Sequence, residues 1–185
     1  MKEIVENFKA DAILSFQNYK KMAERAMEQV SDEEFFAAID SESNPIAVIV
    51  KHIAGNLRSR WTDFLTADGE KPDRHRDTEF EMLDDSRESL MQFWENGWKT
   101  LFDALDPLHA EDFSRKVLIR GEPHTVVEAI NRQLTHYSSH IGQIVLLAKH
   151  FRSSAWKTLS VPRGHSAEFN KMLAEKQAAG IKKPE

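Results

Sequence analysis

The sequence predicts an all-α protein, and three observations support this prediction. Four long segments place apolar residues three and four positions apart, which is the spacing of one face of an α-helix. Apolar residues make up 41% of the chain and charged residues 30%, the proportions of a soluble globular protein. The 185 residues contain no internal repeat and no low-complexity segment. We therefore expect a single domain over residues 1–185.

The N-terminal part of the chain predicts two long helices and a short one between them. The first long helix spans about residues 3–29 by its apolar spacing. A short helical turn is expected at residues 31–34, whose serine and glutamate fit a capping box. The second long helix opens at Asn44 and Pro45, because an N-cap residue followed by proline is a typical helix start. Its pattern fades at residues 66–69.

A long polar connection separates the second and third long helices. Residues 68–85 are irregular and rich in charge, a length that suits an up-up-down-down bundle or the rim of an active site. The third long helix is expected to start at Asp85 or Ser86 and to end at Pro107. Residues 114–123 predict either a small hairpin or a plain loop.

The C-terminal part predicts the fourth long helix and a short final one. From Thr125 to about His150, apolar residues alternate by three and four, a heptad-like spacing typical of helix bundles. The chain is expected to be coil from Arg152. A short helix over about residues 166–179 follows, with phenylalanine and leucine on its apolar side.

Charge and composition exclude several classes of function. The formal net charge is -5, which gives no electrostatic basis for binding nucleic acid or an anionic membrane. The chain has no cysteine, so disulfides, thiolate metal sites and a cysteine nucleophile are excluded. The N-terminus is charged throughout, unlike a signal peptide, and the longest apolar runs are too short to cross a bilayer. We expect a cytoplasmic protein.

Three histidines are the candidate functional residues. His136 and His140 lie four positions apart in the fourth helix, so both imidazoles project from the same face. Such a pair supplies half of a tetrahedral metal shell. On helical wheels, this pair and His52 of the second helix all lie on the flank of the apolar stripe, where a cleft between helices opens. Flank histidines that are half-solvated and inert are the alternative.

Two segments carry a resemblance to a known family. Residues 44–57, read as NPIAVIVKHIAGNL, resemble the second-helix segment of the DinB-like superfamily, and residues 136–144 match its fourth-helix pattern H-x3-H-x-G-Q. Residues 61–70 and 159–164 are similar to a branch of that superfamily whose function is uncharacterised. The resemblance covers the chain from the first helix to about Asn170.

The resemblance implies a fold, a metal and a function. It implies an up-up-down-down four-helix bundle, often dimeric, in which His52, His136 and His140 hold one divalent metal ion. Imidazole ligands suit Zn²⁺ and Ni²⁺, which we expect as the most probable occupants. Relatives include S-transferases that use low-molecular-weight thiols and an isomerase of maleylpyruvate type. Their substrate-pocket residues do not map onto this chain, so the catalytic residues stay unassigned.

Two functional hypotheses follow. The first is a metal-dependent hydrolase or thiol S-transferase acting on a small molecule, because three histidines leave a coordination position open. The second is a non-enzymatic bundle that the metal stabilises and that binds a small molecule or a protein partner. A homodimer is expected in either case. Polar residues beside the histidines that could orient ligands or receive an anionic substrate are Asn56, Gln133, Arg132 and Arg163.

Overall fold

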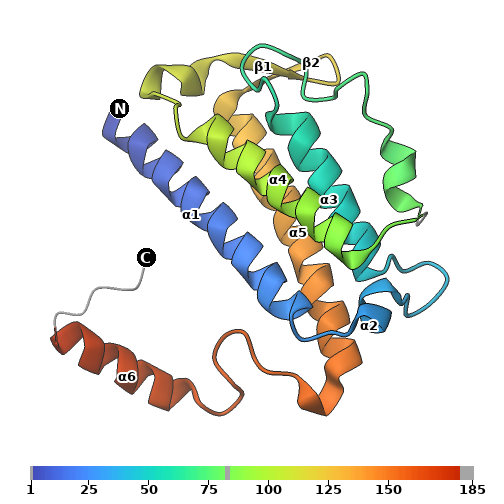
Figure 1. The fold of residues 1–185 in the computed structure, drawn as a ribbon. Helices are drawn as coiled ribbons and strands as arrows, with labels where there is room; N and C mark the ends of the chain where they lie inside the picture. The colour runs from blue at the N-terminus through green and yellow to red at the C-terminus, as the bar shows by residue number, and fades with distance from the viewer. Residues whose placement is uncertain (1, 82–83, 180–185) are drawn as a thin grey trace. The chain divides into compact units, whose positions relative to one another are not determined.

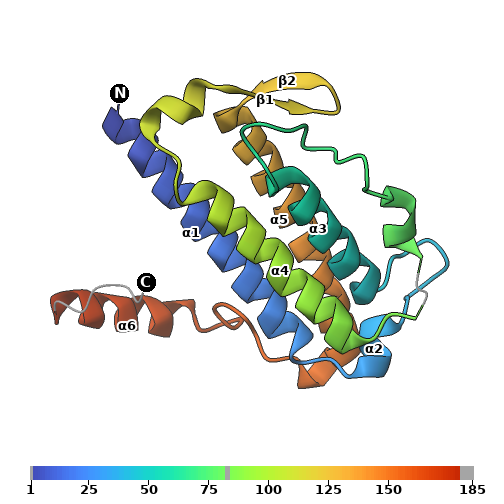
Figure 2. The same ribbon diagram turned by 45° about the horizontal axis from the view of Figure 1, so that its top comes forward.

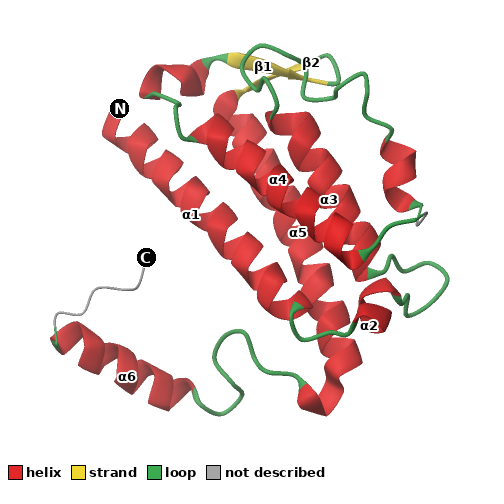
Figure 3. Cartoon of the chain, viewed as in Figure 1, coloured by secondary structure: helices red, strands yellow, loops and turns green. Residues whose placement is uncertain are grey.

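The structure, a computed structural model, describes residues 2–81 and 84–179, which are mostly helical (Figures 1 and 3). The contacts divide the chain into two compact units, residues 1–153 and 154–185, and each is described by itself. A single domain over residues 1–185 stays a prediction. Within the described ranges, no helix has the length and apolar character needed to cross a membrane.

The first unit contains five α-helices and one small sheet among its described residues. The helices are α1 (Lys2–Met27), α2 (Asp32–Phe36), α3 (Ile46–Trp61), α4 (Arg87–Leu105) and α5 (Val126–Arg152). Strands β1 (Lys116–Ile119) and β2 (Glu122–Thr125) pair antiparallel in register, with Ile119 opposite Glu122. The hairpin is thus the correct one of the two alternatives expected for this segment. Its turn needs positive φ angles, which Arg120 and Gly121 adopt at 57° and 77°.

Helix ends follow the local capping chemistry in most places. The expected capping box forms at α2, where Ser31 Oγ accepts from the backbone of Glu34 and the Glu34 carboxylate accepts in return. Ser86 caps α4 as expected. The expected N-cap at Asn44 is wrong, because α3 begins one residue later with Pro45 at the N-cap, where no side chain bonds the helix.

The four long helices form a bundle whose neighbours are fixed by specific contacts (Figure 2). Lys9 near the start of α1 bonds the carbonyls beyond the end of α4, and Arg87 at the start of α4 bonds those after α1, so these two helices are antiparallel. Helix α3 runs parallel to α4 and antiparallel to α5. The directions are therefore up, down, down, up along the chain.

This order corrects the up-up-down-down arrangement that the resemblance implies. The short passage through α2 returns the chain in the opposite direction, so α1 and α3 cannot be parallel. The expected long connection does lie between α3 and α4, and it carries the chain back along the bundle so that these two run the same way. Helices α3 and α5 are neighbours, as the histidine positions required.

Aromatic side chains fill the bundle interior. Phe16 of α1 is fully buried and its ring contacts three others, those of Trp61, Trp98 and Tyr137. The tight packing of α3 on α4 depends on Gly97, where an added Cβ would lie 3.2 Å from the Ala54 carbonyl oxygen. Full burial of one such aromatic side chain contributes about 1.5–3 kcal/mol, so these rings are a main source of the bundle's stability.

The second unit contains α6 (Ser166–Ala178) among its described residues, close to the expected 166–179. No residue of this helix is buried within the chain. His165 Nδ1 lies 2.7 Å from the Glu168 carboxylate, a contact inside this unit. This unit holds none of the residues proposed for the metal site.

Candidate metal centre

Helices α3 and α5 bring the three predicted histidines together. His136 Nε2 lies 3.3 Å from His52 Nε2 and 3.1 Å from His140 Nε2. The ligand atoms of all three lie within 4.8 Å of one another. No other group of three or more histidines, aspartates or glutamates with this proximity occurs in residues 2–81 and 84–179. The three histidines could therefore hold one metal ion.

The spacing of these nitrogens fits a small divalent ion. Two ligands each about 2.0–2.1 Å from one tetrahedral ion lie about 3.3 Å apart, close to the Nε2 separations of 3.3 and 3.1 Å between His136 and the other two histidines. Each imidazole also turns its other nitrogen away from the centre, toward an oxygen acceptor. When each Nδ1 carries the proton and donates to that oxygen, the converging Nε2 atoms present lone pairs, which favours a cation between them.

His52 is held by a chain of hydrogen bonds that runs through Glu79 to Arg74. Its Nδ1 donates to Glu79 Oε2 at 2.8 Å, and the Glu79 carboxylate accepts two hydrogen bonds from Arg74, at 2.8 and 2.9 Å. The side chains of Glu79 and Arg74 are only 8% and 5% exposed. A carboxylate behind a ligating histidine fixes its tautomer and raises its basicity. Glu79 thus prepares His52 Nε2 as a ligand.

Two glutamine side chains contact the Nδ1 atoms of the other two histidines and orient their rings. His136 Nδ1 lies 3.4 Å from Gln133 Oε1, and His140 Nδ1 lies 2.9 Å from Gln143 Oε1. Both glutamines lie three positions from their histidine on α5, so the helix itself sets these contacts. Gln133, which the sequence suggested, therefore has an orienting contact with His136.

The sequence around His52 makes room for Glu79. A Cβ at Gly55 would lie 2.3 Å from Glu79 Oε1, closer than any real contact, so only glycine lets the carboxylate reach α3. The ring of Phe80 covers His52 from the same segment, with ring centroids 5.1 Å apart. His52 is therefore buried, at 5% exposure, which removes for this residue the alternative of a half-solvated flank histidine.

Burial and charge favour the neutral form of His136 and His140 and the ionised form of Glu79. Burial, then the neighbouring His140 and His52, lower the pKa of His136 to about 3. Burial also lowers the pKa of His140, although its Gln143 contact opposes the shift. Burial alone would raise the pKa of Glu79, but hydrogen bonds from His52 and Arg74 lower it overall. At neutral pH, His136 and His140 are therefore unprotonated ligands.

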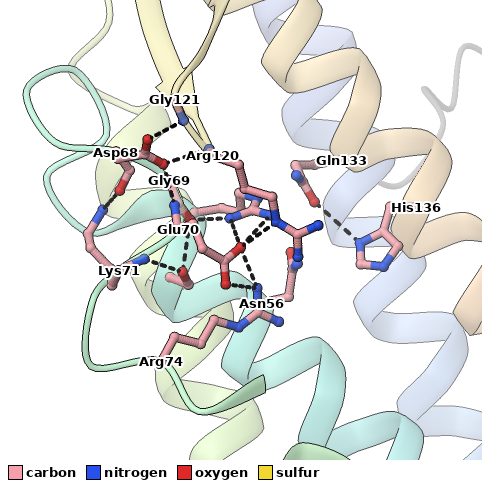
Figure 4. A network of polar contacts seen from close by, with 12 residues as sticks. Asn56, Asp68, Gly69, Glu70, Lys71, Arg74, Arg120, Gly121, Gln133 and His136 are labelled. Carbon is pink, nitrogen blue, oxygen red and sulfur yellow. Dashed lines mark hydrogen bonds and ion pairs between the residues drawn. The ribbon is translucent and has the colours of Figure 1, made fainter. Parts of the chain in front are cut away.

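A second polar network adjoins the histidines (Figure 4). Asp68 accepts hydrogen bonds from the backbone nitrogens of Arg120 and Gly121, at 2.8 and 2.7 Å, which ties the connection to the hairpin turn. Glu70 forms ion pairs with Arg60, Arg74 and Arg120. This arrangement explains the Asp-Gly-Glu sequence at 68–70, because Gly69 also bonds the β1 carbonyl of Leu118.

Sequence reasoning missed the residues of the connection. Glu79 and Arg74 lie in or just before the 3-10 helix η1 (Arg76–Phe80), in a stretch that the sequence marked only as polar and irregular. No periodicity points to either. The remaining histidines lie outside the cluster, as expected, and are His75, His109, His124, His150 and His165. Arg163 lies in the second unit and Arg132 in the first, beside the site.

The comparisons with known proteins give a family but no activity. Residues 3–165 match a family described as "Protein of unknown function (DUF1572)", and the chain therefore belongs to that family. A search of curated proteins found no match. A search of solved structures also found none.

Proposed function

We propose that the protein is a metal-dependent enzyme that binds one divalent ion, Zn²⁺ or Ni²⁺, through His52, His136 and His140. The observation that carries the proposal is the opposite orientation of the two nitrogens in each ring. The three Nε2 atoms converge, while each Nδ1 faces an oxygen atom. A neutral ring whose Nδ1 donates to that oxygen leaves its Nε2 lone pair toward the centre. Imidazole nitrogens in this arrangement are neutral ligands for late first-row ions.

The exposure of the site favours a catalytic over a purely structural role. His136 and His140 are only partly buried, and His52 and His136 line an open cavity. A divalent ion bound by three histidines acts as a Lewis acid and lowers the pKa of a water or thiol in its open position. The reaction class proposed is therefore hydrolysis or transfer of a low-molecular-weight thiol. Because the chain itself lacks cysteine, the thiol would come from a small molecule.

The neighbouring residues orient the ligands. Glu79 holds a proton on His52 Nδ1, and Gln133 and Gln143 do so on the other two rings. These contacts fix the tautomers before a ligand arrives, which reduces the reorganisation that binding requires.

The first experiment measures metal and turnover together. Tag-free protein is analysed for bound metal and screened for thiol conjugation and for ester and amide hydrolysis. His140→Ala is compared with His150→Ala, an exposed histidine on the same helix. We expect wild type and His150→Ala to bind one ion and turn over substrate, and folded His140→Ala to lose both.

Two results would contradict the proposal that the protein is a metal-dependent enzyme. Failure to bind stoichiometric metal after reconstitution would remove every metal-based function. Metal binding without turnover, with a His140→Ala variant that unfolds, would instead support the non-enzymatic bundle stabilised by its metal.

We further propose that the family belongs to the DinB-like superfamily and that the protein is a homodimer, as the sequence resemblance implies. Most soluble oligomers are two-fold dimers. Light scattering at micromolar concentration tests the dimer directly, and a monomer mass would exclude it.

A further inference from the structure

A cationic cavity of about 730 Å³ lies beside the histidine cluster. His52 and His136 are among the residues that line it, together with five arginines from four segments. The arginines are Arg60 of α3, Arg74 and Arg76 of the connection, Arg120 of the hairpin turn and Arg132 of α5. No carboxylate is among the residues that line it. Its volume is that of a typical small-molecule site.

Two antiparallel rows of side chains relate this cavity to the histidines. On α3, His52, Asn56 and Arg60 follow one another at intervals of four residues. On α5, the row of His140, His136 and Arg132 has the same interval. Four residues of helix rise about 6 Å, so the arginines of the rows begin one to two such steps from the histidines. A small molecule can span that distance.

Charge in the cavity is only partly neutralised. Glu70 pairs with Arg60, Arg74 and Arg120, and Glu79 pairs with Arg74. Even if Asp68 at the hairpin turn is counted, three carboxylates face five guanidinium groups. At least two positive charges therefore remain for a ligand.

Arg132 and Arg76 are the arginines available to a ligand. Within the described ranges, Arg132 makes no ion pair or hydrogen bond, and Arg76 only stacks on the Phe80 ring, 4.9 Å from its centroid. Arg60 is buried at 6% exposure, and its Nε has no hydrogen-bond partner among the residues described. Arg60, Arg74 and Arg120 are held in place by their ion pairs with Glu70. The guanidinium groups of Arg132 and Arg76 can donate hydrogen bonds to a ligand.

Asn56, an uncharged residue of the cavity, also presents a donor. Asn56 Oδ1 accepts from the Tyr137 hydroxyl at 3.0 Å, and that hydroxyl accepts from Trp61 Nε1 at 3.2 Å. The buried Tyr137 thus fixes the Asn56 amide with its oxygen turned inward. The Asn56 nitrogen, which bonds no other described residue, is left for the cavity. A wall of N–H donors selects a ligand rich in acceptors.

We propose that this cavity binds the anionic group of a small substrate, a carboxylate or a phosphate, between Arg132 and Arg76. Asn56 donates to the same molecule nearer the histidines. The inference rests on the proposed function for the reaction at the histidines, but anion binding itself needs only the arginines. It narrows the substrate to a small anion whose reacting group lies about 6–12 Å from its charged end.

The test measures anion binding with and without metal. Citrate and inorganic phosphate are titrated by calorimetry into chelator-treated protein and into zinc-loaded protein, with glycerol as the neutral reference. The two anions distinguish a carboxylate site from a phosphate site. We expect one of them to bind and glycerol not to bind.

Matched variants locate the binding site. Arg132→Gln and Arg76→Gln should each lower the affinity for the anion by about tenfold or more, which is the effect of losing a charged hydrogen bond. Arg163→Gln, an exposed arginine of the second unit, should leave it unchanged. Equal affinity in wild type and Arg132→Gln, or no binding of either anion, would overturn the proposal.

The outcome separates this inference from the proposed function. Anion binding to protein that takes up no metal would support the proposed anion site in the cavity and would contradict the proposed metal-dependent activity. Metal binding without any anion binding would leave the proposed metal-dependent activity standing and would contradict the proposal that the cavity is an anion site.

Discussion

The two ends of the α3–α5 interface are built from the same helices but have opposite chemistry. At one end, His52, His136 and His140 turn their Nε2 lone pairs toward one point. At the other end, Arg60 and Arg132 turn N–H donors toward a shared cavity. One end therefore attracts a cation and the other an anion, although only a few helical turns separate them.

The difference lies in what stands behind each group. The histidines have oxygen acceptors behind them, so their free nitrogens must be acceptors too. Three of the arginines have Glu70 behind them, which fixes them without neutralising the cavity. The polarity of each end is thus set by neighbours from the connection and from α5, and not by the two rows alone. Variants of those neighbours can break the comparison at either end.

The largest expected effect is the loss of metal-dependent stability in His136→Ala. Zn²⁺ at about 1,000 times its dissociation constant raises the free energy of unfolding by about 4 kcal/mol when it binds only the native state. We expect that increase in wild type and none in His136→Ala, because His136 lies between the other two ligands. Chemical denaturation with zinc or with chelator measures it. Equal stabilisation of both proteins would show that zinc binds elsewhere.

A smaller effect is expected from Glu79→Gln, which removes the charge behind His52. Loss of such a partner lowers metal affinity by about 10–100-fold. Glu81→Gln, at an exposed carboxylate two residues away, is the matched control and should keep wild-type affinity. Competition with a zinc indicator dye gives both values. An unchanged affinity in Glu79→Gln would mean that His52 needs no carboxylate.

Gly55→Ala should act at the same place by steric means. The new methyl group would collide with Glu79 Oε1, so the carboxylate must withdraw from His52. We expect a loss of zinc affinity no larger than that of Glu79→Gln. Because both changes disturb one contact, the double variant should lose less than the two effects together. Full additivity in the same dye assay would contradict the shared mechanism.

The smallest effect is expected from Gly142→Ala, two residues beyond His140 and so on a different face of α5. Nothing lies within 4 Å of a Cβ added at this position, which is in the middle of α5. Alanine should stabilise the helix by about 0.5–1 kcal/mol and leave zinc affinity unchanged. Thermal unfolding measures the first and the dye assay the second. A loss of affinity would show that this face of α5 contributes to the metal site.

The helices and the histidine cluster were predictable because their signals are local or repeated. Apolar spacing located the four long helices, and the His136–His140 interval placed both rings on one face. His52 required the family resemblance, since nothing local ties it to α5. The direction of the helices was predicted wrongly, because the relative orientation depends on how the connections run and not on any one segment.

The contacts behind the histidines could not be predicted in the same way. Glu79 reaches His52 across 27 residues of chain, from a segment without periodicity. The Arg60 and Arg132 rows were visible as intervals of four, but only the packing of α3 against α5 shows that they face one cavity. Gly55 carried a usable signal, a glycine inside a helix, whose reason appears only with Glu79 in place.

The path from Arg74 through Glu79 to His52 has a consequence for the chain between α3 and α4. A cation at the histidines would draw electron density from His52 and strengthen the pull of its Nδ1 proton on Glu79, which anchors η1 to the bundle. Loading the site should therefore slow amide hydrogen exchange and proteolytic cleavage in residues 74–81 more than in α1, which contributes no residue to the histidine cluster. Protection of residues 74–81 would then report whether a metal ion occupies the histidine cluster.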